Sequence, residues 1–177
     1  MRSSTTVRRF APDEWELYRS LRLAALAESP DAFGSTLAHE RVRADADWAS
    51  RLSRGSTSSR DLPLVAEVNG EPSGLAWVRL GDDHGNVAHL YQMWVAPAKR
   101  SQGVGRALLD AAIAWARGIG AQALVLDVTT GNTVAAQLYH AAGFVATGSE
   151  KPLRPGSALR SRAMRLVLEP SVSKPSA

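Results

Sequence analysis

The chain has 177 residues, of which 45% are hydrophobic and 21% are charged, a composition typical of one globular domain. It contains no cysteine, which excludes disulfides, thiolate zinc sites, iron–sulfur clusters and a thiol nucleophile. The net charge of +4 comes mainly from arginine. This excess is too small to indicate a nucleic-acid binder, but it suits a small anionic ligand, because the guanidinium offers a planar fork of donors.

Both ends of the chain are polar. Residues 1–5 and 169–177 contain too little apolar surface to pack, so we expect two disordered tails around a single domain over residues 6–168. No apolar run follows Met1, and no apolar stretch approaches the roughly 20 residues that a membrane span requires. We therefore expect a cytoplasmic protein with neither a signal peptide nor a membrane partner.

The first elements in chain order are a strand and two helices. Val7–Phe10 is predicted as a short strand. The acidic residues that follow Pro12 favour the start of a helix, and Pro30 ends this helix. A second helix is expected around Trp48 and Leu52.

A loop and a hairpin come next. The serine-rich segment 51–60 is expected to be a long mobile loop. Two apolar runs, 64–68 and 74–80, flank Asn69-Gly70, a dipeptide that readily supplies the positive φ angles of a tight turn. Residues 81–86 are rich in turn formers and precede the next strand.

The strand at residues 87–95 is apolar on both faces, which favours a central place in the sheet. Strict alternation places Val87, Tyr91, Met93 and Val95 on one face and Ala88, Leu90 and Trp94 on the other.

The second half of the chain predicts alternating helices and strands. Apolar residues recur at helical spacing from Val104 to Trp115, and the glycines at positions 118 and 120 end this helix. The remaining elements are a strand at 123–128, a short helix from Asn132 to Ala142, and strands at 144–147 and 163–168. A strand–helix–strand unit over 87–128 implies a parallel crossover, so we expect an α/β or α+β fold with a mixed sheet.

The turn between the central strand and the long helix carries a candidate anion site. Gly103 and Gly105 let a ligand approach the backbone, and the first amides of a helix have no intrahelical acceptor. Lys99, Arg100 and Arg106 lie around the same point. These features suit a pyrophosphate, although a glycine-capped surface helix with solvated arginines would give the same pattern. The third glycine of a dinucleotide fingerprint is absent, as is the Gly-Lys-Ser/Thr of a Walker loop.

Two motifs then point to a family. Arg100-Ser-Gln-Gly-Val-Gly105 resembles the acetyl-CoA signature Gln/Arg-x-x-Gly-x-Gly/Ala of the GCN5-related N-acetyltransferases (GNAT). Asn132-Thr-Val-Ala-Ala-Gln-Leu-Tyr-His-Ala-Ala-Gly-Phe144 resembles that family's Asn-x-x-Ala-x-x-Leu-Tyr-x-x-x-Gly-Phe. The resemblance covers residues 64–168, with the motifs in the family's order.

The resemblance implies a GNAT-like fold with a splayed central pair of parallel strands and helices on both faces. It implies acetyl-CoA as co-substrate and no metal. Pantetheine would lie between the splayed strands, bonded to backbone groups of Met93 and Val95, and Asn132 would reach the pantetheine arm. The pyrophosphate would bind the amides of Gln102 to Arg106. By the same resemblance the residues at the cofactor are Met93, Trp94, Val95, Arg100, Ser101, Gln102, Gly103, Val104, Gly105, Arg106, Asn132 and Tyr139.

In this family the amine attacks the thioester directly, and the absence of cysteine agrees with that route. Tyr139 matches the family's tyrosine, which acts as acid toward the leaving thiolate. The backbone amide of Met93 occupies the family's oxyanion position, beside a bulge in the strand. His89 stands where many relatives carry a glutamate, and it is either the general base or a buried core histidine.

Other routes for the proton stay open. Gln92 could position a water, Glu40 and Asp127 are weaker candidates for the base, and a chain of waters would need no single base.

The acceptor is expected to be a primary amine of a small molecule. In the family, the segments that correspond to 29–40 and 149–161 line the acceptor side, and the second is basic here. A protein or peptide N-terminus is an alternative acceptor, and a non-catalytic acyl-CoA sensor is an alternative function. No nucleic-acid partner is expected, and a homodimer is compatible with the family.

Overall fold

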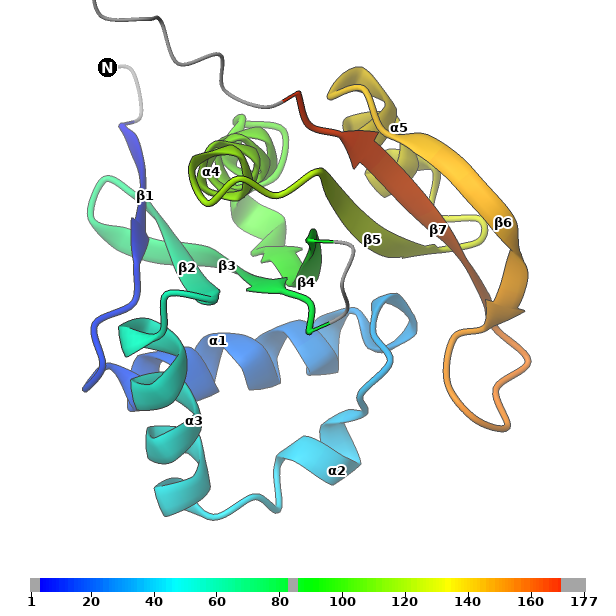
Figure 1. Ribbon diagram of the computed structural model, residues 1–177. Helices are drawn as coiled ribbons and strands as arrows, with labels where there is room; N and C mark the ends of the chain where they lie inside the picture. The colour runs from blue at the N-terminus through cyan, green and yellow to red at the C-terminus, as the bar shows by residue number, and fades with distance from the viewer. Residues whose placement is uncertain (1–3, 83–85, 170–177) are drawn as a thin grey trace, which may run out of the picture.

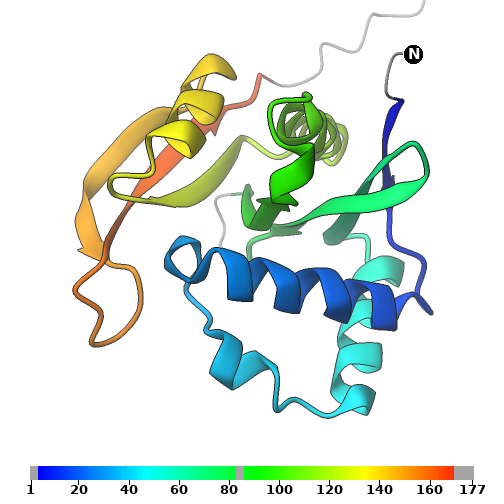
Figure 2. The same ribbon diagram turned by 180° about the vertical axis from the view of Figure 1, so that it is seen from behind.

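The computed structural model of the chain describes residues 4–82 and 86–169. Within these residues a seven-stranded mixed sheet has the order β1-β2-β3-β4-β5-β7-β6, with helices on both faces (Figures 1 and 2). The strands are β1 (Thr5–Arg9), β2 (Asp61–Val68), β3 (Glu71–Leu80), β4 (Val87–Val95), β5 (Ala123–Thr129), β6 (Val145–Pro152) and β7 (Arg160–Val167). The helices are α1 (Trp15–Glu28), α2 (Leu37–Glu40), α3 (Asp45–Thr57), α4 (Val104–Gly118) and α5 (Thr133–Ala141), with 3-10 turns η1 (Pro30–Ala32) and η2 (Pro97–Lys99).

Most predicted elements are confirmed, some with shifted ends. Strand β4 has the predicted bounds, and Asn69 and Gly70 adopt φ angles of 53° and 81° in the predicted tight turn. Strand β1 begins at Thr5, inside the segment 1–5 that was expected to be disordered, because it pairs with Val68 of β2. The expected tails at 1–3 and 170–177, and part of the predicted turn at 81–86, lie outside the described residues.

The prediction of a mobile loop at 51–60 is wrong. Helix α3 continues to Thr57 and β2 begins at Asp61, so only three residues connect them. The helix persists despite its serines and glycine because it packs on the sheet: Leu52 is fully buried, and a Cβ on Gly55 would lie 2.3 Å from Cζ2 of Trp77. Tertiary packing therefore overrides the local preference for a loop.

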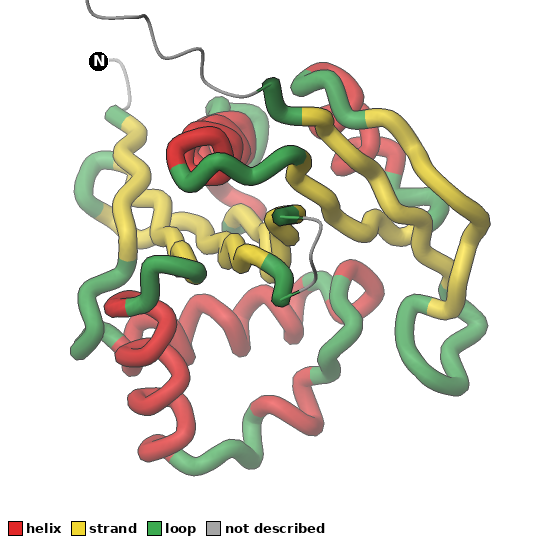
Figure 3. The backbone as a smooth tube through the Cα atoms, in the orientation of Figure 1, coloured by secondary structure: helices red, strands yellow, loops and turns green. Residues whose placement is uncertain are grey.

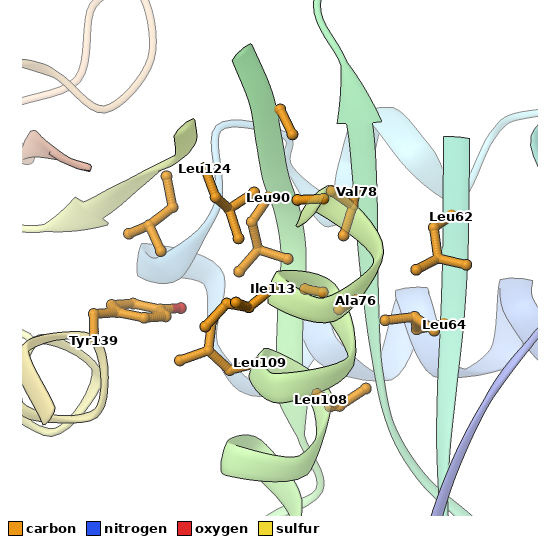
Figure 4. Packing of buried hydrophobic residues seen from close by; sticks show 14 of the residues in the cluster. Leu62, Leu64, Ala76, Val78, Leu90, Leu108, Leu109, Ile113, Leu124 and Tyr139 are labelled. Carbon is orange, nitrogen blue, oxygen red and sulfur yellow. The ribbon is translucent and has the colours of Figure 1, made fainter. Parts of the chain in front are cut away.

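The sheet separates two apolar clusters. One lies between the sheet and helix α4 and includes Leu108 and Leu109, as Figure 4 shows. The other lies between the sheet and helices α1 and α3 and includes Tyr18 and Trp48. Helix α4 thus covers one face and α1 and α3 cover the other. None of the described helices is long and apolar enough to cross a membrane.

A bulge in β4 corrects the predicted faces of this strand. Ala88 and Leu90 belong to the cluster under α4, but Trp94 belongs to the cluster under α1. Gln92 has a φ of 58°, and the register with β3 shifts at this point. The extra residue of a bulge reverses the alternation of side chains, so Trp94 does not share a face with Leu90.

The parallel pair at the centre of the sheet splays apart. Only three residues of each strand pair: Val87–His89 of β4 pair with Ala123–Val125 of β5. Beyond these three pairs β4 stays with β3 and β5 stays with β7 (Figure 3). The splayed parallel pair expected from the family resemblance is therefore confirmed.

Candidate active site

A cavity of about 950 Å³ lies where β4 and β5 diverge. Its lining comes from both sides of the sheet: Tyr139, Leu90 and Leu126 belong to the cluster under α4, whereas Phe33 and Trp77 belong to the cluster under α1 and α3. A further part of the lining comes from Ala32, Phe33, Gly34 and Ser35 on one segment and from Lys151 and Leu153 on another. The cavity therefore extends through the opening between the two strands.

The segments 29–40 and 149–161, expected on the acceptor side, both contribute to this lining. They are also bonded to each other, because Arg154 donates to the carbonyl oxygens of Phe33 (2.9 Å) and Pro30 (3.3 Å). The second segment is thus not merely a solvated loop, since it closes one side of the cavity.

The bulge in β4 leaves Met93 without a partner strand. The register with β3 passes from Tyr91 to Trp94, and the register with β5 ends at His89. Oε1 of Gln92 accepts a hydrogen bond from the Tyr18 hydroxyl at 3.0 Å. Burial raises the pKa of Tyr18, so this phenol stays protonated and holds the bulge from the α1 side.

The N-terminus of α4 follows β4 along the chain and lies beside the end of that strand. Gly103 precedes the helix with a φ of 82°, and the first bond within the helix runs from the amide of Ala107 to the Gly103 oxygen, at 3.0 Å. The amides of Val104, Gly105 and Arg106 come before that bond, so they have no acceptor within the helix. Gly105 lies close to the end of β4, because a Cβ there would be 3.7 Å from Cγ2 of Val95 and 3.9 Å from Cε of Met93.

The three basic side chains predicted around this helix end are all engaged in ion pairs. Each is paired with a carboxylate: Lys99 with Glu71 (3.1 Å), Arg106 with Asp110 (2.8 Å) and Arg100 with Glu28 (2.6 Å). The backbone amides are donors outside these ion pairs, and each paired side chain also keeps N–H groups that its carboxylate does not use.

Glu28 connects the end of α1 to the end of β4. Its carboxylate accepts hydrogen bonds from Arg100, from the Ser29 hydroxyl and from Nε1 of Trp94, at 3.0 Å for the indole. These bonds lower the pKa of Glu28 to about 2. Arg100 also donates from Nε to the Val95 oxygen at 3.0 Å. The Trp94 ring is buried against α1, which leaves its backbone as the part that could meet a cofactor.

Three further residues predicted at the cofactor lie on exposed turns. Ser101 has a φ of 60°, and Gln102 donates from its side chain to the Ala98 oxygen at 3.0 Å. Asn132 caps α5, because its Oδ1 accepts the amide of Ala135 at 3.2 Å. Only the Nδ2 group of Asn132 is left to donate to a ligand.

Tyr139 lies in the lining of the cavity at the end of α5. Its side chain is 7% exposed and its ring packs on Phe144 at a centroid distance of 5.8 Å. In Figure 4 the hydroxyl points away from α5 toward helix α4. Burial raises the pKa of Tyr139 to about 12, so the hydroxyl is a neutral hydrogen-bond donor.

His89 lies on the cavity wall. It belongs to neither apolar cluster, is partly exposed, and stacks on Tyr91 with ring centroids 6.0 Å apart. The structure therefore does not support a buried core histidine at this position.

The weaker candidates for the base are both engaged in ion pairs. Glu40 is 2% exposed and is held by Arg43 and Arg51, each at 3.3 Å. Burial alone would raise the pKa of Glu40, but the hydrogen bond from Arg43 and the charge of Arg51 bring it below the ordinary value. Asp127 lines the cavity and pairs with Lys151 at 2.9 Å.

Sequence reasoning missed the arginines of the cavity. Arg22, Arg51, Arg54 and Arg79 all line it. For Arg22 a signal was present, because it follows Tyr18 by four residues and precedes Leu26 by four. A charged residue within an apolar helical stripe points into the interior of the fold.

Solved acetyltransferases share this fold. One from Streptococcus pneumoniae, of the GNAT family, superposes with a TM-score of 0.79 at 23% identity, over 94% of this chain and 100% of that chain. The Salmonella typhimurium protein yncA, solved with its cofactor acetyl-CoA, gives 0.77 at 22% identity, over 99% and 100%. At these identities the likeness is one of fold.

The sequence identifies the family. The profile of the acetyltransferase (GNAT) family matches residues 20–144, and the chain belongs to this family. A mycothiol acetyltransferase of Stackebrandtia nassauensis is 31% identical over 78% of this chain and 44% of its own length. The aminoglycoside N(6')-acetyltransferase type 1 of Stenotrophomonas maltophilia is 31% identical over 82% of this chain and 89% of its own length. The chain spans under half the length of three mycothiol acetyltransferases that it matches, covering 42%, 44% and 46% of them.

Proposed function

We propose that this protein is an N-acetyltransferase that moves the acetyl group of acetyl-CoA directly to a primary amine of a small molecule. The observation that carries the proposal is the cavity between the diverging strands β4 and β5, together with the N-terminal amides of α4 close to the end of β4. The absence of cysteine supports direct transfer, because no acyl-thiol intermediate can form on this chain.

The unpaired edge of β4 fits an extended pantetheine chain. After His89 this edge has no partner on β5, so the backbone groups of Met93 and Val95 are available to an amide-bearing ligand. The carbonyl oxygen of Val95 already accepts from Arg100, but a carbonyl has a second lone pair. The amides of residues 104–106 would hold the pyrophosphate at the positive end of the helix dipole.

When bound, acetyl-CoA supplies the thioester carbon that the amine attacks. The amide of Met93, which no strand register pairs, would donate to the oxygen that becomes negative as the amine adds. Tyr139 would donate a hydrogen bond to the leaving sulfur. Its pKa of about 12 exceeds the ~8.5 of a thiol by roughly 3.5 units, so full proton transfer would cost about 5 kcal/mol. Coenzyme A would therefore leave as the thiolate, stabilised by this hydrogen bond, and take its proton from water.

His89 would take the proton that the amine loses. Its imidazole lines the cavity and is partly exposed, so it could pass the proton on to solvent. A chain of waters through the same cavity is the alternative, in which His89 only lines the route.

The relatives favour a small acceptor. Two named activities among them are mycothiol acetyltransferase and aminoglycoside N(6')-acetyltransferase. A peptide N-terminus and a non-catalytic acyl-CoA sensor remain the competing proposals, and one assay separates all three.

The test is release of free thiol from saturating acetyl-CoA in the presence of a panel of small amines and short peptides. A small-molecule enzyme releases thiol with the amines, a peptide enzyme only with peptides, and a sensor binds acetyl-CoA without acceptor-dependent release. For the active amine, His89→Ala is expected to lower kcat by about 100-fold while the affinity for acetyl-CoA changes little. An unchanged kcat in this variant would leave the water chain as the route of the proton.

A further inference from the structure

Arg22 is a buried cation with unpaired donors on the wall of the cavity. Its side chain comes from the middle of α1 and is 3% exposed. Its Nε and Nη1 atoms are buried and have no hydrogen-bond partner among the described residues. An unsatisfied buried polar group costs free energy, and a charged one costs more, so such an arrangement calls for an explanation.

The surroundings hold Arg22 in place without neutralising it. The guanidinium lies over the Phe33 ring, with Cζ 4.7 Å from the ring centroid. The neighbouring acid, Glu40, already has two arginine partners, Arg43 and Arg51. Burial lowers the pKa of Arg22, yet a guanidinium stays protonated in proteins. Arg22 therefore presents a fixed positive charge with spare donors.

The acids of the cavity do not offset this charge. Asp127 pairs with Lys151, and Asp61 accepts from Nε1 of Trp77 at 2.9 Å and lies 3.8 Å from Arg79. Basic residues outnumber acids in the lining: Arg22, Arg51, Arg54, Arg79 and Lys151 against Asp61 and Asp127. The cavity as a whole thus favours a ligand with a negative group.

We infer that the acetyl acceptor is a small amine that also carries a carboxylate, and that Arg22 binds this carboxylate. The inference rests on the proposed function, because it describes the second substrate of the same site. A guanidinium matches a carboxylate in a planar geometry, and Nε and Nη1 of Arg22 have no partner among the described residues. His89 and Arg22 line one cavity, so a single acceptor could place its amine near the diverging strands and its carboxylate on α1.

The preferred acceptor of this chain would then differ from that of the aminoglycoside N(6')-acetyltransferase similar to it. An aminoglycoside carries several amino groups, and a cavity with five basic and two acidic lining residues would repel it. A carboxylate-bearing amine would instead satisfy the donors of Arg22.

The experiment uses glycine, β-alanine, 4-aminobutanoate and the standard amino acids as acceptors, each beside its own carboxamide. Thiol release under saturating acetyl-CoA gives kcat/KM for each pair. The unaltered protein is expected to prefer the acid by at least about 10-fold, and Arg22→Met to bring the ratio to within about 3-fold. Arg22→Lys keeps the charge without the fork, so it should retain part of the preference. The matched control is Arg19→Met, one turn earlier on α1, where the arginine pairs with Asp45 at 3.2 Å.

Equal rates with acid and carboxamide, or a preference that survives in Arg22→Met, would overturn the inference.

If no amine releases thiol, the proposed function fails, and the carboxylate site is then tested by binding alone. N-acetylated amino acids should raise the melting temperature of the unaltered protein and of Arg19→Met, but not of Arg22→Met. Their carboxamides should have no such effect, and a rise that is the same for acid and carboxamide would count against the site.

Discussion

Replacing Arg22 by methionine should make the ligand-free protein more stable. The side chain is buried and its Nε and Nη1 are unpartnered, so folding removes a charge from water without replacing all of its hydrogen bonds. Methionine is flexible enough to fill the space of the aliphatic stem beside Phe33. Glu40 keeps Arg43 and Arg51 as partners, so the substitution leaves no acid unpaired.

The expected rise in melting temperature follows from the gain in free energy of unfolding and from the entropy of unfolding. Replacing buried ionic groups by apolar residues stabilises proteins by about 1–4 kcal/mol, and we expect the lower part, about 1–3 kcal/mol, because Arg22 still interacts favourably with Glu40. A chain of 177 residues has an unfolding entropy of about 0.37 kcal/mol/K near 60 °C. The melting temperature should therefore rise by about 3–8 °C.

The assay is thermal unfolding, supported by urea unfolding, of the ligand-free protein. Arg51→Met is the informative comparison, because it leaves Glu40, which is 2% exposed, with one arginine fewer, and it should lower the melting temperature. If Arg22→Met lowers the melting temperature as much as Arg51→Met does, Arg22 is already satisfied in the folded protein, and the reasoning that assigns it to a ligand fails.

Two further predictions concern the frame around the site. Glu28 has a pKa of about 2 against an ordinary 4.5; because the folded value is the lower one, its contribution is complete above about pH 5 and is lost as the pH falls toward 2. Urea unfolding should thus show a smaller loss of stability between about pH 5 and pH 3 for Glu28→Gln than for the unaltered protein, and equal losses would mean that the Arg100 pair contributes nothing. Gly55→Ala places a Cβ 2.3 Å from Cζ2 of Trp77, so it should destabilise the fold by about 1–3 kcal/mol. Gly118→Ala is the control, because nothing lies within 4 Å of its added Cβ, and it should not destabilise the fold. An unchanged melting temperature for Gly55→Ala would show that Trp77 moves at no cost.

Local sequence signals were sufficient for the elements that depend on local chemistry. The turn at Asn69-Gly70 has the predicted left-handed angles, and β4 ends where its apolar run ends. The bulge at Gln92 is different, because its support comes from Tyr18, 74 positions earlier in the chain. No pattern within the strand indicates such a distant contact, so the bulge was predicted from the family resemblance alone.

The same distinction holds for the site. The glycines and the helix start at Gly103 could be predicted because they are neighbours in sequence. The partner of Arg100 could not be predicted, since Glu28 lies 72 positions away in the sequence. Arg22 was visible as a charge in an apolar stripe, but its missing partners emerge only when the neighbouring elements are in place.

The early separation of β4 from β5 also bears on how this protein avoids aggregation. An unpaired strand edge is a template on which a strand of another molecule can add. Here the separation produces two such edges in the middle of the sheet, between β3–β4 on one side and β5–β7 on the other. Helices on both faces and the segment around Phe33 enclose the approach. A slender extended molecule can reach these edges, whereas a strand that belongs to another folded sheet is kept out by its own neighbours.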